Sequence, residues 1–218
     1  MKLHGETPNR PARRDRCVGK MARNKKRSTA SPLANFIFEA GMLKRLPRSG
    51  WSVVGVKNPE SVADHSFRCG VIGYLLARME GAPLDTVLLM TLFNDIHESR
   101  ITDMHKMAQR YIDAEAAEGR SFKEQIEELS GPIRKELTRI RREYVEQRTA
   151  ASVIARDADI LECLIQAKEY HEAGFLQAVR FTEKAPRFLK TKSARNIWKA
   201  VQSAHSGQWW EKLGDFKR

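Results

Sequence analysis

The chain has 218 residues and a formal net charge of +12 at pH 7, and 41% of its residues are hydrophobic and 8% aromatic. These values are typical of one folded domain with a sizeable core. There is no run of about 18 apolar residues and no apolar segment in the first twenty residues, so we expect neither a membrane span nor a secretory signal. The three widely spaced cysteines, Cys17, Cys69 and Cys163, favour reduced thiols and a cytoplasmic location.

The positive charge is concentrated at the two ends of the chain. Residues 1–27 hold ten Lys or Arg and two acids, a net of +8, which leaves +4 for the other 191 residues. A second basic region follows residue 178. We predict a disordered basic N-terminal tail over residues 1–30 and a folded domain over residues 31–218. Such a tail attracts RNA or phosphate surfaces; the simpler alternatives are a solvated extension or sequence upstream of a start at Met21.

The first half of the chain contains three predicted helices. Ser31 and Pro32 predict a helix start, and the helix should run to about residue 46, where residues 47–51 break it. A second helix is predicted over residues 61–80, closed by Gly81. The third, over residues 84–97, is nearly all apolar and should be central. The expected buried side of the second helix consists of Val62, Phe67, Val71, Ile72, Leu75 and Leu76.

The second half of the chain continues the helical pattern. We predict helices over residues 103–118, 121–129, 132–147 and 149–173, and a last helix after Ser193. The sequence has no strand-like alternation, no glycine-rich phosphate loop, no CxxC pair and no internal repeat. The predicted fold class is therefore all-α.

Three metal-ligating side chains occur in three separate apolar segments. His65 lies in the second predicted helix, Asp95 at the end of the third, and Asp159 in the long later helix. Burying an unpaired carboxylate is costly, and convergence on one divalent cation would remove that cost for all three groups together. Glu98 follows Asp95 by about one helical turn, where a carboxylate can exchange a proton with water at a metal.

The chain resembles the HD-domain phosphohydrolases, in particular the 5'-deoxynucleotidases that act on nucleoside monophosphates. The resemblance covers residues 36–170 and rests on five segments in the same order: LKRLPRSGW (43–51), PESVADHS (59–66), NDIHE (94–98), TD (102–103) and DILEC (159–163). It implies an all-α HD-domain helical bundle over residues 31–218 with a metal site in the core. It also implies a divalent metal cofactor, a nucleotide substrate and a homodimer.

The family's functional residues can be assigned by position. The resemblance implies that His65, Asp95 and Asp159 are metal ligands and that Asp95 and Glu98 are catalytic, with Glu98 handling protons. The roles it implies for the two other residues are phosphate binding by Arg48 and contact with the sugar by Asp103. A guanidinium suits phosphate because it can bind two oxygens at once.

The sequence departs from the family at Asn94, where the HD pair has its histidine. An amide oxygen is a neutral, weak ligand that suits Mg or Mn better than Co, so we expect a divalent ion (Mn, Co or Mg) with Asn94 as a poor fourth ligand. The alternatives are recruitment of His97 or His105 as a replacement ligand, or loss of catalysis.

Several of these residues also have simpler interpretations. Taken alone, His65 could be a core histidine with its hydrogen bonds satisfied, and Arg48 a solvated surface side chain. Glu98 could pair with Arg100 or Lys106. Asp103 could be the N-cap of a helix that begins near Met104, and we expect Asp157 to face solvent. We expect Trp209 and Trp210 to form an apolar clasp or a dimer contact rather than to stack on bases.

We therefore expect a metal-dependent phosphomonoesterase that hydrolyses 5'-(deoxy)nucleoside monophosphates to nucleoside and phosphate. One alternative keeps the enzyme but changes the substrate to another phosphate ester or a nucleoside polyphosphate. The other alternative is a catalytically impaired HD-fold protein that binds nucleotide or RNA, which Asn94 and the basic termini favour.

Overall fold

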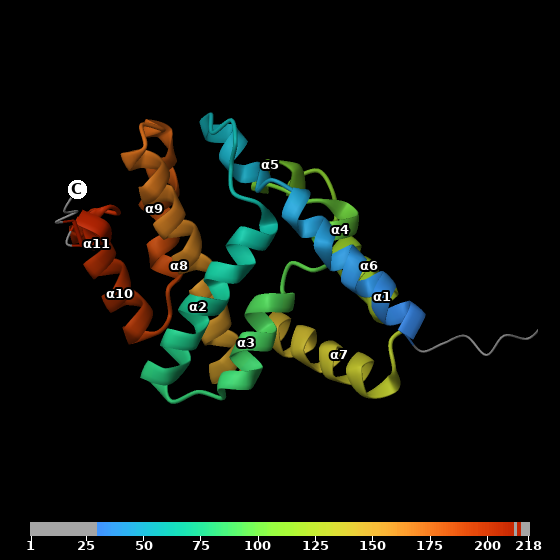
Figure 1. Ribbon diagram of the computed structural model, residues 1–218. Coiled ribbons are helices and arrows are strands. Elements are labelled where there is room, and N and C mark those ends of the chain that lie inside the picture. The colour runs from blue at the N-terminus through green and yellow to red at the C-terminus, as the bar shows by residue number, and fades with distance from the viewer. Residues whose placement is uncertain (1–29, 212, 215–218) are drawn as a thin grey trace, which may run out of the picture.

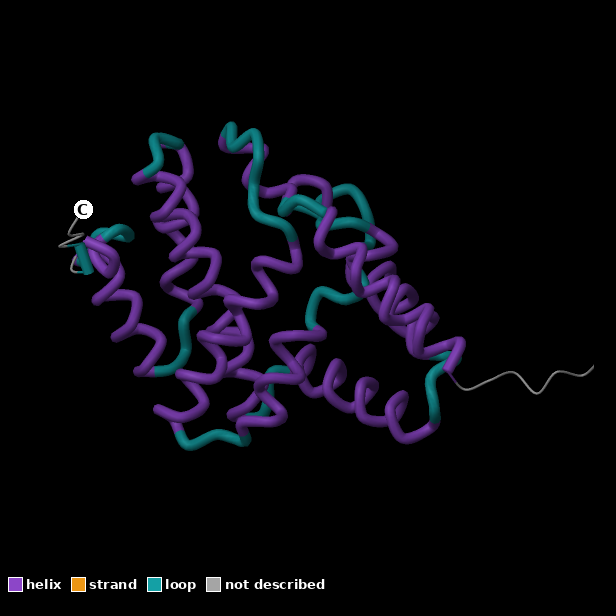
Figure 2. The backbone as a smooth tube through the Cα atoms, viewed as in Figure 1, coloured by secondary structure: helices purple, strands orange, loops and turns teal. Residues whose placement is uncertain are grey.

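The computed structural model describes residues 30–211 and 213–214, and this part of the chain is helical without a β-strand (Figures 1 and 2). The helices, with η marking a 3-10 helix, are α1 (Ala30–Ala40), η1 (Gly41–Arg45), η2 (Ser49–Val54), α2 (Val62–Glu80), α3 (Leu84–Phe93), α4 (Glu98–Ile101), α5 (Lys106–Gln109), α6 (Ala114–Ile126), α7 (Gly131–Glu146), α8 (Ala150–Glu172), η3 (Leu176–Val179), α9 (Arg180–Lys184), η4 (Ala185–Phe188), α10 (Lys192–Ser203) and α11 (Gln208–Glu211). The predicted all-α class is confirmed. Residues 1–29 of the predicted tail, Cys17 among them, lie outside the described residues, and Ala30 begins α1.

Helices α2, α3 and α8 pack against one another at the centre, with α7 and α10 against α8 (Figure 1). Their shared core contains fully buried apolar side chains such as Leu76, Val87, Leu161 and Leu164. A second apolar cluster joins η1 to α6 and α7 through residues such as Leu43, Phe122 and Leu137. Together the two clusters fix α2, the end of α3 and α8 relative to one another. No helix in the described residues has the length and apolar character needed to cross a membrane.

Local signals explain the boundaries of the central helix α2. Ser61 Oγ accepts a hydrogen bond from the Asp64 amide at 3.1 Å, and Asp64 accepts one from the Ser61 amide at 2.9 Å, which is a capping box. Gly81 ends the helix in the left-handed region at φ +70°. Both ends agree with the prediction.

The predicted inner side of α2 is partly wrong. Phe67, Val71 and Leu75 are 70%, 46% and 47% exposed, whereas Val62, Ile72 and Leu76 are buried as expected. Apolar residues occur around most of this helix, so periodicity alone did not separate its two sides. The inner side also carries polar and small residues: His65, Ser66, Cys69, Gly70 and Gly73.

The chain between Asn94 and Ile126 also differs from the prediction. Helix α3 ends at Phe93, and the predicted helices over residues 103–118 and 121–129 are replaced by α4, α5 and α6. Thr102 interrupts the helical path at φ +63°, ψ 167°. The His105 ring accepts a hydrogen bond from the Ala108 amide and begins α5, and Asp113 caps α6 through the Ala116 amide.

The close approach of α3 to α2 depends on a glycine. A Cβ atom on Gly73 would lie 3.0 Å from Thr91 Cγ2 and 3.2 Å from Val87 Cγ1. This approach places the end of α3, with Asp95 just beyond it, close to His65 on α2. Gly119, inside α6, has open space around the same position.

These two glycines give a matched test of the helix contact. Gly119→Ala should stabilise the fold by about 0.5–1 kcal/mol, the usual gain inside a helix. Gly73→Ala should lack that gain and unfold at lower urea concentration than the Gly119 variant, because its methyl group crowds Thr91 and Val87. Equal stabilisation of the two variants in urea unfolding would show that α3 is not in tight contact with α2.

Candidate metal centre

The three predicted metal ligands from separate helices come together in the structure. Nε2 of His65 lies 3.1 Å from Oδ1 of Asp159 and 3.5 Å from Oδ2 of Asp95. His65 is 1% exposed and Asp95 is 8% exposed. His65 is thus a buried histidine with both ring nitrogens hydrogen-bonded, as the simpler interpretation also expects, but its partners are carboxylates that also suit a metal ion.

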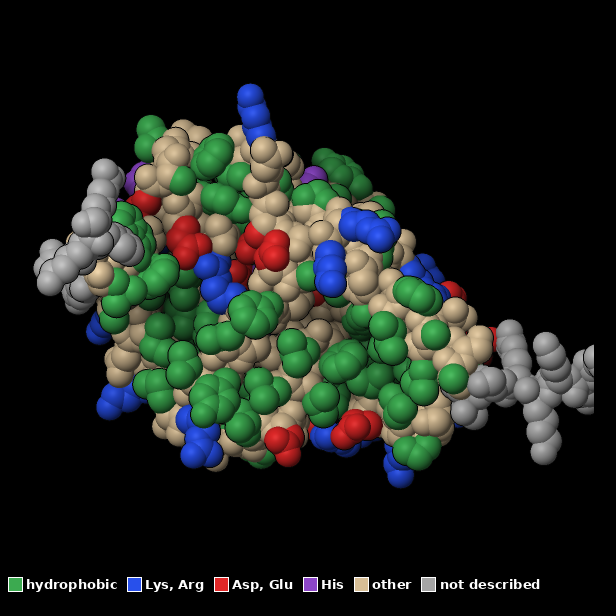
Figure 3. All heavy atoms as spheres, in the orientation of Figure 1, with side chains coloured by type: hydrophobic (Ala, Val, Ile, Leu, Met, Phe, Trp, Pro, Cys, Tyr) green, Lys and Arg blue, Asp and Glu red, His purple; other side chains and the backbone are tan. Residues whose placement is uncertain are grey.

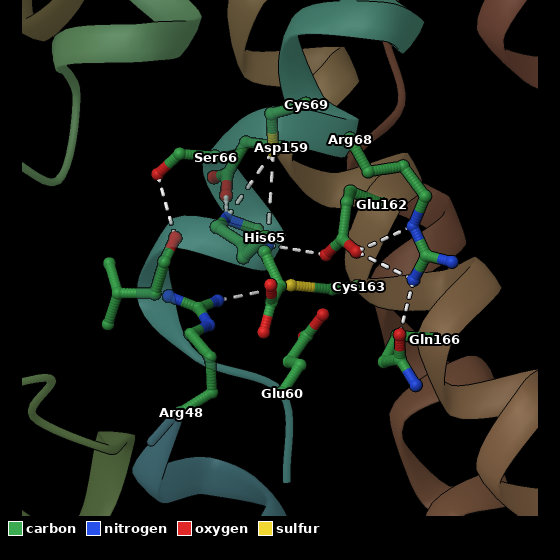
Figure 4. A network of polar contacts seen from close by, with 12 residues as sticks. Arg48, Glu60, His65, Ser66, Arg68, Cys69, Asp159, Glu162, Cys163 and Gln166 are labelled. Atoms are coloured by element: carbon green, nitrogen blue, oxygen red, sulfur yellow. Dashed lines mark hydrogen bonds and ion pairs between the residues drawn. The ribbon is translucent and has the colours of Figure 1, made fainter. Parts of the chain in front are cut away.

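The other ring nitrogen of His65 is bound by Glu162, which is fully buried (Figure 4). Arg68 holds Glu162 with two hydrogen bonds, 2.9 Å from Nε and 2.7 Å from Nη2. Burial by itself raises the pKa of Glu162, but the His65 hydrogen bond and the Arg68 charge hold this pKa below its ordinary value. An ionised Glu162 can only accept, so Nδ1 of His65 carries a proton. The surrounding acidic groups also raise the pKa of His65 above its ordinary value despite burial, so without a bound ion Nε2 donates a hydrogen bond to Asp159. A divalent cation would displace this second proton and take the Nε2 lone pair, with Glu162 fixing the tautomer.

Glu162 is a residue that the sequence reasoning missed. It lies three residues after Asp159, so it is on nearly the same side of α8, and Arg68 lies three residues after His65 on α2. These two spacings, each of about one helical turn, are the sequence signal that could have identified Glu162 and Arg68. Arg68 also contacts Gln166 and Glu169, which ties α2 to α8 over more than one turn.

Asn94 lies beside Asp95 rather than between the three ligands. Its side-chain NH2 group donates to Oδ1 of Asp95 at 2.8 Å, which leaves Oδ2 of Asp95 facing His65. A cavity of about 10 Å³, enough for one water molecule, lies next to Asn94 and is lined by residues that include Met90, Phe93 and Tyr144.

Neither proposed replacement histidine faces this centre. Nδ1 of His97 lies 3.3 Å from Arg141 and Nε2 lies 3.7 Å from Glu118, on the side of α6 and α7. Burial, followed by the Arg141 charge, lowers the pKa of His97 to about 4. His105 is used as the cap of α5. The structure therefore gives no support for recruitment of either side chain.

Arg48 enters the centre from the loop between η1 and η2. Its Nη1 lies 3.8 Å from carboxylate oxygens of both Asp95 and Asp103, and Nη2 donates to the Cys163 sulfur at 3.4 Å. The side chain is 16% exposed, so the interpretation of Arg48 as a solvated surface residue is wrong. Glu60, which the sequence reasoning also missed, holds this loop: its carbonyl accepts from the Arg48 amide at 2.9 Å and its carboxylate from the Trp51 indole at 3.0 Å.

Asp103 binds the loop that carries Arg48 instead of capping a helix at Met104. Its Oδ2 accepts a hydrogen bond from the Ser49 amide at 2.5 Å. Thr102, the residue before it, has a backbone conformation that is usual only for glycine, and this turn directs Asp103 toward Arg48.

Glu98 is 8% exposed, and its Oε2 has no hydrogen-bond partner among the described residues. Burial, followed by repulsion from Asp95 and Asp103, raises the pKa of Glu98 to about 10. The alternative pairing partners contact other residues, Arg100 with Glu39 and Lys106 with Gln109. Without a bound ion, Glu98 is therefore a neutral carboxylic acid at pH 7 that can donate a proton.

Two further expectations about polar and aromatic residues are corrected. Asp157 is fully buried and accepts hydrogen bonds from the Lys190 and Thr191 amides at 2.8 and 2.7 Å, so it holds the segment that leads into α10. Trp209 and Trp210 remain 70% and 51% exposed and do not form a clasp over the body of the protein.

The donor set fits a divalent cation. Nε2 of His65 lies within 3.5 Å of both carboxylates in a largely buried position, and Oε2 of the nearby Glu98 has no hydrogen-bond partner in the described part of the chain. Borderline and hard divalent cations accept this mixture of nitrogen and oxygen ligands.

Comparison with known proteins agrees with this geometry. The sequence profile of a family described as HD domain matches residues 40–201, so the chain belongs to the HD domain family, and the predicted resemblance is confirmed. It is 30% identical to the 5'-deoxynucleotidase HDDC2 of Homo sapiens over 68% of this chain and 74% of that protein. It is 32% identical to the 5'-deoxynucleotidase HDDC2 of Dictyostelium discoideum over 61% and 74%.

Solved structures share the fold. A conserved hypothetical protein from Pyrococcus furiosus superposes with a TM-score of 0.68 at 33% identity, over 78% of this chain and 99% of that one. A predicted metal-dependent phosphohydrolase from Magnetospirillum magnetotacticum has a TM-score of 0.67 at 20% identity, over 82% and 93%.

The contact between Glu162 and His65 should control metal affinity. Glu162→Gln should weaken the binding of Mn²⁺ or Co²⁺ about 10–100-fold, because the neutral amide no longer fixes the tautomer of His65 or raises its basicity. Isothermal titration of metal-stripped protein measures this affinity. Glu169→Gln is the control, because Glu169 contacts Arg68 at 2.7 Å but makes no hydrogen bond to His65. Equal affinity of the two variants would contradict the role assigned to Glu162.

Proposed function

We propose that this chain is a metal-dependent phosphohydrolase that hydrolyses 5'-deoxynucleoside monophosphates to nucleoside and phosphate. The observation that carries the proposal is the convergence of His65, Asp95 and Asp159 from three separate parts of the chain, with Glu98 and Arg48 around them. Membership of the HD domain family supports a hydrolytic enzyme with a divalent metal cofactor. The names of the relatives, 5'-deoxynucleotidase, support the substrate class.

In this proposal, His65, Asp95 and Asp159 hold the ion, and Asn94 is a weak fourth ligand through its amide oxygen while its NH2 group holds Asp95. A bound divalent ion lowers the pKa of water and neutralises charge on the phosphate. The guanidinium of Arg48 binds two phosphate oxygens.

Proton transfer is assigned to Glu98. The oxygen of water forms a new bond to phosphorus, and the bond between phosphorus and the 5' oxygen breaks. Glu98, which burial keeps protonated, gives its proton to the departing 5' oxygen and is reprotonated by the proton that water releases. Asp103, held beside Arg48, accepts a hydrogen bond from a sugar hydroxyl.

The test of this function is phosphate release from metal-stripped protein. Deoxynucleoside and ribonucleoside monophosphates are assayed with Mn²⁺, Co²⁺ or Mg²⁺ added in turn. We expect turnover that depends on the metal and falls at least about 100-fold in Asp95→Ala, because one ligand charge is lost. A cooperatively melting protein without turnover under any of these metals would instead favour the second candidate, a catalytically impaired HD-fold protein that binds nucleotide or RNA, which Asn94 favours.

Position 94 gives an independent prediction. Asn94→His should bind Mn²⁺ or Co²⁺ at least about tenfold more tightly, because imidazole is the stronger ligand. Asn94→Ala is the control and should bind more weakly than the parent protein, since Asp95 loses its hydrogen bond. Unchanged affinity in both variants would place Asn94 outside the metal's ligands.

We also propose a cytoplasmic homodimer that uses the outer side of α2. Phe67, Val71, Tyr74 and Leu75 are 46–70% exposed and are spaced as one side of a helix. Figure 3 shows hydrophobic side chains gathered over this face. An apolar patch of this kind is typical of a protein interface.

The basic tail lies outside the described residues, so its contact with nucleic acid stays a prediction.

A charge on this patch should separate the two subunits. Val71→Glu should lower the mass measured by sedimentation equilibrium to that of a monomer, because a carboxylate would be buried in an apolar contact. Tyr111→Glu is the control, since Tyr111 is 83% exposed and lies beyond α5, away from this stripe. A parent protein that sediments as a monomer would contradict the proposed dimer.

A further inference from the structure

Cys163 lies at the edge of the metal centre, and the mechanism proposed above does not use it. A ring nitrogen of His65, a carboxylate oxygen of Asp159 and the Cys163 sulfur all lie within 4.8 Å of one another. Asp159 and Cys163 are four residues apart on α8, so both project from one side of that helix toward α2 (Figure 4). The sulfur also accepts a hydrogen bond from Arg48 at 3.4 Å.

We infer that Cys163 is a ligand of the metal ion, as a thiolate, and that it makes this centre prefer Co²⁺ or Zn²⁺ to Mn²⁺ or Mg²⁺. The inference rests on the proposed function, because it concerns the same centre. A thiolate is a soft ligand that strengthens the binding of Co²⁺ and Zn²⁺ far more than that of hard cations. It would replace the strong ligand that is absent at Asn94.

The separations allow such an arrangement. Bonds of roughly 2.0–2.3 Å in a tetrahedral site place nitrogen, oxygen and sulfur ligands about 3.3–3.8 Å apart. The three groups are within 4.8 Å of one another, so small side-chain rotations of about 1 Å would bring them to a common ion.

A nearby group also indicates that a ligand belongs in this centre. Glu98 is 8% exposed, and among the described residues its Oε2 has no hydrogen-bond partner.

Cys69 has a different geometry and serves as the control. Its sulfur lies 3.4 Å from Nε2 and 3.9 Å from Nδ1 of His65, and two similar distances place it over the ring rather than on the line of the Nε2 lone pair. It also forms a group with His65 and Glu162, but Glu162 already binds Arg68 and Nδ1 of His65. Cys69 is therefore a packing contact of the histidine.

The test is the absorption spectrum of the full-length protein loaded with Co²⁺. The parent protein and Cys69→Ser should show the visible bands of bound cobalt together with a near-ultraviolet sulfur-to-cobalt charge-transfer band. Cys163→Ser should keep the visible bands but lose the charge-transfer band. Its preference for Zn²⁺ over Mn²⁺, measured by competition, should fall at least about tenfold.

The outcomes that overturn the inference are distinct from failure of the proposed function. Visible cobalt bands without a charge-transfer band in the parent protein, or loss of that band in Cys69→Ser alone, would show that Cys163 only accepts the Arg48 hydrogen bond. Phosphate release could still be intact in that case. Absence of any cobalt binding would overturn this inference and the metal-dependent function together. If Cys163→Ser does not fold, cadmium NMR of the parent protein decides, because a thiolate ligand shifts the cadmium resonance strongly downfield.

Discussion

The pair of buried side chains His65 and Glu162 joins the two central helices at the point where the chemistry is expected. A fully buried carboxylate is unfavourable unless it is paired, and Glu162 is paired twice, with the histidine on one oxygen and with Arg68 on the other. The same pairing keeps a proton on Nδ1 of His65. The position of α2 against α8 and the protonation of His65 therefore depend on one set of contacts.

The other elements bring their residues to this point. Gly73 lets α3 approach α2, so that Asp95 follows the end of α3 close to His65. The loop that carries Arg48 is held by Glu60, which precedes α2, and by Asp103, which follows α4. The positive charge of Arg48 and the negative charges of the surrounding carboxylates are thus brought together by the tertiary structure and not within any single helix.

Much of the fold was predictable from the sequence because its signals are local, and the proximity of His65, Asp95 and Asp159 was predictable from their order along the chain. The Ser61 cap, Gly81 and the apolar run before Asn94 define helices without reference to the rest of the chain. The other features depend on distant residues: Asp103 contacts Ser49, and Asp157 binds amides 33 and 34 residues further on. Glu162 was missed for a related reason, since a glutamate in a helix is usually exposed and only its partners on α2 explain its burial.

Thr102 has a consequence for motion near the substrate position. Its backbone at φ +63°, ψ 167° lies in a region that costs a residue with a side chain about 1–3 kcal/mol. That cost is present while Asp103 remains docked on the Ser49 amide, and it is released if the segment swings away. The strain therefore raises the population of an opened state roughly 5–150-fold over what a glycine would allow. The segment that docks Asp103 on the Ser49 amide therefore opens more readily than it would with glycine at position 102, and it borders the loop that we propose binds phosphate.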